Sequence, residues 1–331
     1  MKPNLKDKFR GCVIGQCLGD ALGFPVEGAD ADTCDEFIMH LGRQWYDGKI
    51  SLDEFKGQYT DDSQLARELM ISLVECGDFN PDDYAARINE IFHTDRIIGR
   101  GLACDAAAMR LNDGCTWREA GCPPPAAGNG TAMRAAPIGL FFHNNLNEMI
   151  ASAHEQGFIT HQDPRCSAGS IAIAGAVAIA IKSEFVDVKS FVDTLAGWME
   201  PYHQGFADEV RMLNEWVILP IDKAAKVIAK AGNPDIKQTG WSTISPYVIP
   251  SVLWSLYSFL KYHENYWDAI STAIRVGGDV DTTGAMTGAI SGAHLGIKAI
   301  SGEISRKVND LGQWTYTDLI QLTDRLYELA N

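Results

Sequence analysis

Glycine recurs every fourth residue, at positions 284, 288, 292 and 296, within the apolar stretch from Thr282 to Ile300. Residues four apart share one face of an α-helix, so these glycines would give that face no side chains. Each glycine weakens a helix by about 1 kcal/mol relative to alanine, and close approach of a neighbouring helix backbone is the natural compensation. The pattern therefore predicts a central helix, and its N-terminus would bring Asp279 and Asp281 into the middle of the fold.

Helical apolar spacing dominates the rest of the chain. It covers residues 61–74, 81–92, 189–199, 223–231, 246–260 and 316–329, and residues 167–181 resemble a second central helix with a face of small residues. Sustained period-2 alternation is missing, so strands are not expected. Irregular stretches are expected at 29–56, 115–130 and 232–245, and no linker divides the chain. These features predict an all-α fold with one domain spanning residues 1–331.

Charge and cysteine content narrow the functional classes. Acidic residues outnumber basic ones by 43 to 28, a net charge of −15, which argues against polynucleotide binding by a basic surface but not against a small phosphorylated ligand. The eight cysteines are scattered without a Cys-x-x-Cys pair, as expected of reduced thiols in the cytoplasm. No signal peptide is recognised. Residues 167–181 are too few for a membrane span, and 282–300 include His294 and Lys298, so no membrane association is expected.

Three acidic segments are candidates for chemistry. Thr60, Asp61 and Asp62 open a predicted helix and would form a hard-oxygen corner suited to Mg²⁺, Mn²⁺ or Ca²⁺, although an ordinary N-cap explains them equally well. Asp279 and Asp281 follow Gly277-Gly278, a turn that can direct both carboxylates to one centre. If they are buried, they need counter-charge. Glu27 would lie on a loop after the first helix, where a surface position is the simpler reading.

Two further segments could bind an anion. Gly128-Asn129-Gly130-Thr131 is a glycine-rich turn that leads toward a helix and could present free N–H groups to phosphate. It matches neither the dinucleotide-binding fingerprint nor the P-loop. His161 could line the same site or be an ordinary turn residue, and Trp45 and Tyr46 could cover that site, stack on a ligand ring or belong to a packed surface loop.

Taken together, five segments in this order resemble the ADP-ribosylglycohydrolase family, which includes dinitrogenase-reductase-activating glycohydrolase. The segments are residues 19–27, 59–63, 128–137, 160–163 and 277–285, and the resemblance extends from about Phe9 to about Gly296. It implies a compact, orthogonal multi-helix domain with two divalent metal ions, usually Mg²⁺ or Mn²⁺, in a central cleft.

The resemblance also implies roles for individual residues. The implied metal ligands are Thr60, Asp61, Asp62, Asp279, Asp281 and Thr282. Glu27 would lie beside the metals and the scissile ribose, and catalysis is assigned to Glu27, Asp61 and Asp62. Substrate-binding roles are implied for Gly99, Gly101, Asn129, Gly130, Thr131 and His161, and for the backbone N–H groups of Ala126 and Ala127.

The implied reaction is hydrolysis of the bond between C1″ of the distal ribose and an acceptor side chain, on an ADP-ribosylated protein or a small ADP-ribosyl conjugate. The branch that cleaves serine-linked and polymeric ADP-ribose has Gly-Ser-Tyr where this chain has Pro125-Ala126-Ala127, which favours an arginine-linked substrate. Alternatives are a serine-linked substrate, a small ADP-ribosyl or nucleoside conjugate, a Mg²⁺-dependent phosphohydrolase, and a catalytically idle ADP-ribose-binding or structural protein. The oligomeric state is not implied.

Overall fold

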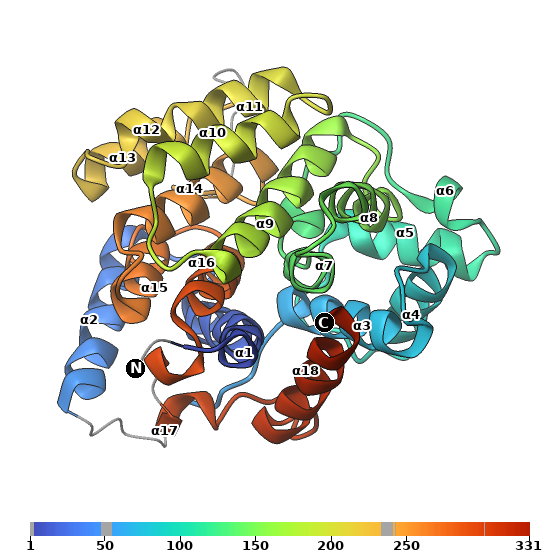
Figure 1. Ribbon diagram of the computed structural model, residues 1–331, viewed down its shortest axis with the longest axis horizontal. Helices are drawn as coiled ribbons and strands as arrows, with labels where there is room; N and C mark the ends of the chain where they lie inside the picture. Colours follow the sequence, from blue (N-terminus) through green and yellow to red (C-terminus); the bar gives the residue numbers. More distant parts are fainter. Residues whose placement is uncertain (1–2, 48–54, 233–240, 242, 301) are drawn as a thin grey trace.

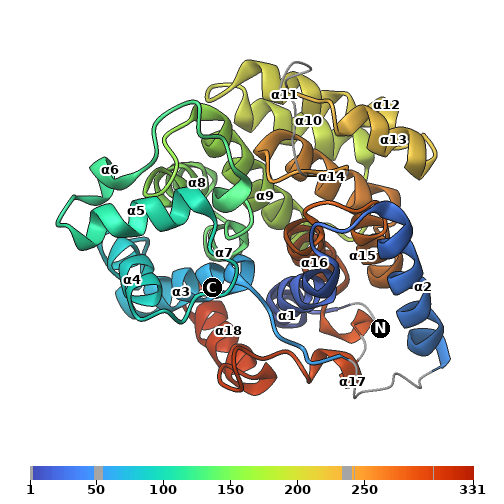
Figure 2. The ribbon, with the colours of Figure 1, turned by 180° about the vertical axis from the view of Figure 1, so that it is seen from behind.

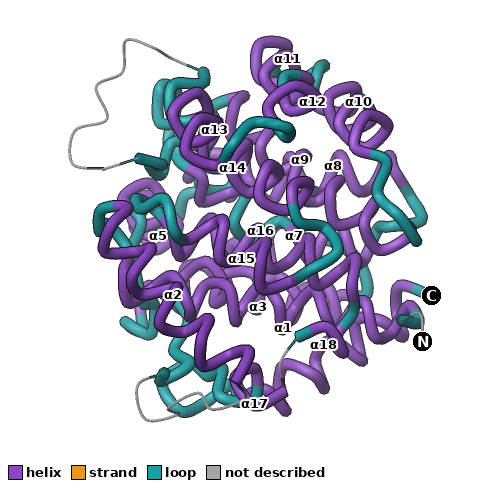
Figure 3. Tube along the Cα trace, turned by 90° about the vertical axis from the view of Figure 1, so that its left-hand side faces the viewer, coloured by secondary structure: helices purple, strands orange, loops and turns teal. Residues whose placement is uncertain are grey.

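Helices account for nearly all regular structure in the computed structural model, which describes residues 3–47, 55–232, 241, 243–300 and 302–331 (Figure 3). For residues 43–47 it describes the backbone alone. No strand beyond isolated bridges occurs within these ranges, which confirms the all-α prediction. The α-helices are α1 Leu5–Gly23, α2 Ala31–Asp47, α3 Asp61–Cys76, α4 Pro81–His93, α5 Leu102–Asn112, α6 Trp117–Ala120, α7 Ala136–Phe141, α8 Leu146–Phe158, α9 Pro164–Lys182, α10 Val188–Met199, α11 Gln204–Arg211, α12 Leu213–Trp216, α13 Ile221–Ile228, α14 Val248–Lys261, α15 Tyr266–Ile274, α16 Val280–Leu295, α17 Gly302–Ser305 and α18 Tyr316–Ala330. Short 3₁₀ turns lie at η1 Phe24–Val26, η2 Asn129–Thr131 and η3 Ile297–Ala299.

Two antiparallel helices, α1 and α16, form the centre of the fold (Figure 1). Both carry glycine every four residues, and the two glycine faces meet. A Cβ added to Gly11, Gly15 or Gly19 would overlap the backbone carbonyl of Gly292, Gly288 or Gly284 respectively. The close backbone approach expected from the glycine repeat is therefore present, and α1 provides the partner backbone.

The second small-faced helix, α9, is buried beside this pair but packs differently. Its Gly169 faces the Val248 side chain of α14, and its Gly175 faces Leu195 and Trp198 of α10. Helix α9 is long and apolar enough to cross a membrane, but 83% of its apolar window is buried inside the protein. Here the glycines make room for large side chains rather than for another backbone.

Two expectations about boundaries are wrong. The stretch 29–56 was expected to be irregular, yet its larger part is α2, where Cys34, Ile38 and Leu41 are buried at helical spacing. Asp30 Oδ1 accepts a hydrogen bond from the Thr33 backbone at 2.9 Å and caps this helix. The central helix ends at Leu295 rather than Ile300, because Gly296 has a φ of 75° and begins the separate turn η3.

The remaining helices cover the central pair on several sides. In Figure 1, α10 to α13 lie at the top, α2 and α15 at the left, and α3, α4 and α18 at the lower right. Seen from behind, α3 and α16 lie near α1 (Figure 2), and Thr60 and Asp281, at the starts of α3 and α16, lie against Asp20 and Gly23 at the end of α1. The fold therefore brings together the start of two helices and the end of a third.

Candidate active site

A turn of two glycines places Glu27 against the start of α16. Gly277 and Gly278 have φ angles of 76° and 97°, in the left-handed region that favours glycine, and a Cβ on Gly278 would overlap the Ile244 backbone. Gly28 N–H donates to the Gly278 carbonyl at 2.9 Å, and Asp279 N–H donates to the Ile244 carbonyl at 2.8 Å. Three segments that are distant in sequence are thus held together by backbone hydrogen bonds.

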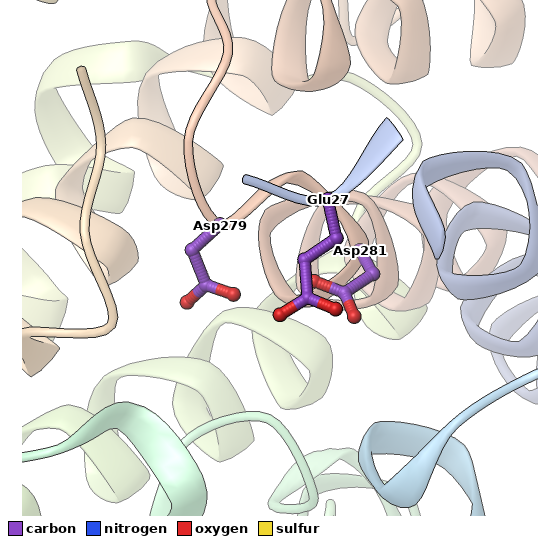
Figure 4. Close-up of side chains that lie close together, drawn as sticks. All are labelled: Glu27, Asp279 and Asp281. Atoms are coloured by element: carbon purple, nitrogen blue, oxygen red, sulfur yellow. The ribbon is translucent and has the colours of Figure 1, made fainter. Parts of the chain in front are cut away.

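Three carboxylates converge at this junction (Figure 4). Glu27 extends from the turn after α1, Asp279 is the N-cap of α16, and Asp281 lies in its first turn. Each offers one oxygen, and these oxygens all lie within 4.8 Å of one another. Asp279 and Asp281 are buried, whereas Glu27 is exposed.

The start of α3 is fixed by a residue that sequence reasoning did not assign. Buried Asp20, from α1, accepts hydrogen bonds from the backbone N–H groups of Thr60 (3.0 Å) and Ser63 (3.1 Å). Thr60 Oγ1 lies 3.0 Å from both Asp20 Oδ1 and Asp62 Oδ2 and donates its hydrogen to one of them. Asp20 thus caps α3 from a neighbouring helix. An acid in the otherwise apolar run Cys17-Leu18-Gly19-Asp20-Ala21-Leu22 was the available signal, because a buried carboxylate needs donors.

Thr282 connects the two acidic segments. Its hydroxyl oxygen lies 3.1 Å from Asp279 Oδ1 and 3.3 Å from Asp62 Oδ2. The other oxygen of Asp62, Oδ1, is buried and has no hydrogen-bond partner among the described residues. A buried carboxylate oxygen without a partner, beside further carboxylates, fits the hard-oxygen ligand set that Mg²⁺ or Mn²⁺ prefers.

Burial and mutual repulsion both disfavour negative charge on these carboxylates. Burial raises the pKa of Asp61, Asp62 and Asp281 well above the ordinary aspartate range, and the neighbouring carboxylates raise it further. Burial also raises the pKa of Asp279, and it raises that of Asp20 to about 7. Bound divalent cations would relieve this repulsion and keep the carboxylates ionised.

A cavity of about 580 Å³ opens over these carboxylates. Its volume lies within the ordinary range for small-molecule sites. A larger cavity of about 720 Å³ adjoins the C-terminal end of α9, where Phe142, Phe191 and Trp198 form part of its wall. We assign the active site to the smaller cavity because it holds the clustered carboxylates.

Most of the sequence candidates line this cavity, namely Glu27, Asp61, Asp62, Gly99, Gly101, Asn129, Gly130, His161, Asp279, Asp281 and Thr282. A Cβ on Gly99 would lie 2.8 Å from Asp61 Oδ1, so only glycine fits over that carboxylate. The Asn129 amide donates to Asp279 Oδ2 at 2.5 Å and to Ser251 Oγ at 2.9 Å, so it orients a carboxylate of the cluster.

The remaining candidates do not line the cavity, and the structure gives several of them other partners. Thr60 lies behind the cluster on Asp20. Thr131 Oγ1 donates to the Cys166 carbonyl at 2.8 Å, and Ala126 N–H donates to the Pro123 carbonyl at 3.2 Å. The structure therefore does not support a free Ala126 N–H, and Ala127 is likewise outside the lining. The side chains of Trp45 and Tyr46 fall outside what the structure describes.

The cavity also has walls that the sequence did not indicate. Trp241 lines it beside Pro246, and Cys104 lies near Gly130, where an added Cβ would approach its sulfur to 3.0 Å. Trp241 lies in a stretch without periodicity or a recognisable motif, so nothing in the sequence singled it out.

Comparison with known proteins agrees with this architecture. The chain belongs to the ADP-ribosylglycohydrolase family, whose sequence model matches residues 1–331. Members of this family hydrolyse ADP-ribosyl bonds. The ADP-ribosylhydrolase ARH3 of Xenopus tropicalis is 28% identical over 88% of this chain and 88% of its own length. The ADP-ribosylarginine hydrolase Tri1 of Serratia proteamaculans (strain 568) is 24% identical over 89% of this chain and 73% of its own. A solved structure titled ADP-ribosylglycohydrolase-related protein complex shares the fold, with a TM-score of 0.69 at 22% identity over 99% of both chains.

Proposed function

We propose that this chain hydrolyses the glycosidic bond between ADP-ribose and arginine on a modified protein, releases ADP-ribose, and requires two divalent metal ions, Mg²⁺ or Mn²⁺. The observation that carries the proposal is the convergence of the Glu27, Asp279 and Asp281 oxygens within 4.8 Å, beside the buried, unpartnered Asp62 Oδ1. Family membership supplies the class of bond.

Metal ligands are assigned to both acidic segments. Asp61, Asp62, Asp279 and Asp281 would hold the ions, with the hydroxyl oxygens of Thr60 and Thr282 close to Asp62. When bound, divalent cations supply Lewis-acid chemistry to hydroxyl groups and water. The hydrogen bonds from Asn129 and Thr282 orient Asp279 in advance, so the ligand set is partly assembled by the protein.

The reaction itself requires stabilisation of positive charge and transfer of a proton. Departure of the acceptor builds oxocarbenium-like charge at C1″ of the ribose, and the buried carboxylates stabilise it electrostatically. Glu27 is the candidate for the proton transfer, because it lies on the exposed side of the cluster. Although the residue is exposed overall, its carboxyl group is partly desolvated by the surrounding protein; this desolvation, and then the neighbouring Asp279, raise its pKa toward neutral pH, where a general acid or base is most effective. It would deprotonate or position the water, or assist the leaving group.

Two observations favour arginine as the acceptor. Pro125-Ala126-Ala127 lacks polar side chains for a ligand. One of the relatives is named ADP-ribosylarginine hydrolase. A second candidate is another ADP-ribosyl linkage, serine-linked or on a small conjugate, because a relative with higher identity carries the broader name ADP-ribosylhydrolase.

The test is release of ADP-ribose from arginine-ADP-ribosylated protein, serine-ADP-ribosylated protein and free ADP-ribosylarginine, each with EDTA and with Mg²⁺ or Mn²⁺. We expect metal-dependent release from arginine-linked substrates. Release from the serine-linked substrate alone would contradict the acceptor assignment. Release of AMP or phosphate would indicate a phosphohydrolase, and tight ADP-ribose binding without turnover would indicate a binding protein.

We also propose that the enzyme works in the cytoplasm on ADP-ribosylated proteins. All eight cysteines are free, as expected in a reducing compartment. Quantifying reversibly oxidised thiols in protein isolated from its own cells tests this, and we expect free thiols at all eight positions.

A further inference from the structure

One wall of the cavity carries a buried histidine with a ring nitrogen beside the glycine turn that borders the ligand space. His161 is 2% exposed and lines the cavity. Its Nε2 faces the turn that contains Gly128 and Gly130, and a Cβ on Gly128 would lie 3.2 Å from Nε2. Among the described residues, none forms a hydrogen bond with Nε2, whereas Nδ1 lies 2.9 Å from Thr160 Oγ1. Which nitrogen carries the hydrogen decides whether this wall donates or accepts.

Behind the histidine lies a fully buried arginine with no carboxylate partner among the described residues. Arg134 Nη2 donates to Thr160 Oγ1 at 2.8 Å and to the Gln156 carbonyl at 2.9 Å, and its Nε donates to Gln156 Oε1 at 2.8 Å. A guanidinium group is a donor only. Thr160 Oγ1 therefore accepts from Arg134, and its own hydrogen must point elsewhere.

Three groups could accept that hydroxyl hydrogen: His161 Nδ1, the Gly157 carbonyl oxygen and the sulfur of Cys104, which is a weak acceptor and already lies 3.6 Å from the donor Arg134 Nη1. His161 Nδ1 lies at 2.9 Å, whereas the Gly157 carbonyl oxygen lies at 3.4 Å and already accepts the backbone N–H groups of Thr160 and His161 at 3.0 Å each. The shorter contact with the unused acceptor is the stronger one. Thr160 then donates to Nδ1, so Nδ1 accepts and Nε2 carries the hydrogen of the neutral ring.

Charge supports the same assignment. Burial, and next the positive charge of Arg134, lower the pKa of His161 to about 3, although nearby Asp163 acts in the opposite direction. The ring is therefore neutral at physiological pH. A hydrogen on Nδ1 would also point toward the hydroxyl that already receives the guanidinium N–H, which is the less favourable arrangement.

We propose that Arg134 and Thr160 are positioning residues that hold His161 in its Nε2–H tautomer and so present a fixed hydrogen-bond donor to an oxygen of the ADP-ribosyl ligand. The identity of that ligand rests on the proposed function, whereas the tautomer is a property of the protein alone. A neutral donor suits a wall near an acidic cluster, because it binds a phosphate or hydroxyl oxygen without pairing with the carboxylates.

The tautomer can be measured directly. Long-range ¹H–¹⁵N correlation spectra of the ligand-free protein at neutral pH report which ring nitrogen of each histidine is protonated, and His161→Gln identifies the His161 signals by their loss. We expect the Nε2–H form. A ring protonated on Nδ1, or on both nitrogens, would overturn the proposal.

Variants of Thr160 test the positioning role. Thr160→Val removes the hydroxyl at nearly constant shape, and we expect mixed tautomers and a dissociation constant for ADP-ribose, with Mg²⁺ present, about tenfold higher, equivalent to ~1.4 kcal/mol. Thr160→Ser restores the hydroxyl and should restore both readouts. The matched control is Thr323→Val in α18, and it should change neither; Thr323 is buried, and among the described residues its hydroxyl bonds only the Leu319 carbonyl.

The outcomes separate the two proposals. An unchanged tautomer in Thr160→Val would refute the role of Thr160, and a changed tautomer with unchanged affinity would refute the donor role of His161. If the wild-type protein showed the Nε2–H form but did not bind ADP-ribose, the proposed function would fail while the tautomer assignment stood.

Discussion

Gly288→Ala tests whether the close approach of α1 and α16 holds the fold together. A Cβ at position 288 would lie 2.8 Å from the Gly15 carbonyl carbon and still closer to its oxygen, whereas ordinary contact begins at 3.4 Å. The two backbones must therefore separate by roughly 0.6 Å or more, since a backbone carbonyl cannot rotate away as a side chain can. Overpacking of this kind costs ~1–3 kcal/mol, and alanine returns about 1 kcal/mol of helix propensity. Because neither backbone can move aside as a side chain can, we expect a cost near the upper end of this range. The free energy of unfolding should therefore fall by about 2 kcal/mol in total.

The matched control is Gly197→Ala in α10. An added Cβ there meets nothing within 4 Å, so the same chemical change should stabilise the protein by ~0.5–1 kcal/mol. The assay is thermal unfolding by circular dichroism in EDTA, where 1 kcal/mol corresponds to about 1–2 °C for a chain of this length. Gly288→Ala should unfold at a lower temperature than wild type, and Gly197→Ala at a slightly higher one. A Gly288→Ala protein as stable as wild type would refute the packing argument.

Three further predictions concern the cluster. Turnover should fall at least a hundredfold in each of the variants Asp61→Asn, Asp62→Asn and Asp279→Asn. Mn²⁺ should no longer stabilise these variants in thermal melts, although their helical circular dichroism should be retained. Normal turnover in any variant would refute the assignment of that residue as a metal ligand. Glu27→Gln should lower kcat at least tenfold while the dissociation constant for ADP-ribose changes less than threefold, and an equal loss of both would remove its special role. Without metal, stability should fall as pH rises from about 4 to about 7. The folded-state pKa of Asp20 is about 7 against an ordinary 3.8, and the pKa values of Asp61, Asp62 and Asp281 are also strongly raised. We expect these carboxyls together to outweigh the buried histidines, whose lowered pKa values act in the opposite direction, so the folded protein binds more protons in this range. Melts in EDTA at pH 5 and pH 8 check this, and a higher melting temperature at pH 8 would contradict it.

The glycine repeat allowed one part of the fold to be predicted from the sequence. It correctly required a backbone partner for α16, but it did not identify α1, although Gly11, Gly15, Gly19 and Gly23 have the same spacing. A helix face without side chains indicates that another segment of the chain packs closely against it. Which segment does so depends on the tertiary structure. Helix α2 was missed although Cys34, Ile38 and Leu41 have helical spacing in the sequence.

The sequence predicted which segments form the site but not how they lie relative to one another. Both aspartate segments and Glu27 were singled out, yet their common position depends on hydrogen bonds among the backbones near Gly28, Ile244 and Gly278, which no local pattern encodes. The family resemblance implied that Thr131 binds the ligand, but its hydroxyl bonds the Cys166 carbonyl. Asp20 was visible as an acid in an apolar run, and only the structure shows that it caps α3.

The most direct test of the central claim, that these carboxylates form a metal centre, is anomalous X-ray diffraction from crystals soaked in Mn²⁺. We expect two Mn²⁺ ions bound by oxygens of Asp61, Asp62, Asp279 and Asp281, together with loss of ADP-ribose release in EDTA. Absence of Mn²⁺ from these carboxylates, with turnover unaffected by EDTA, would contradict the account.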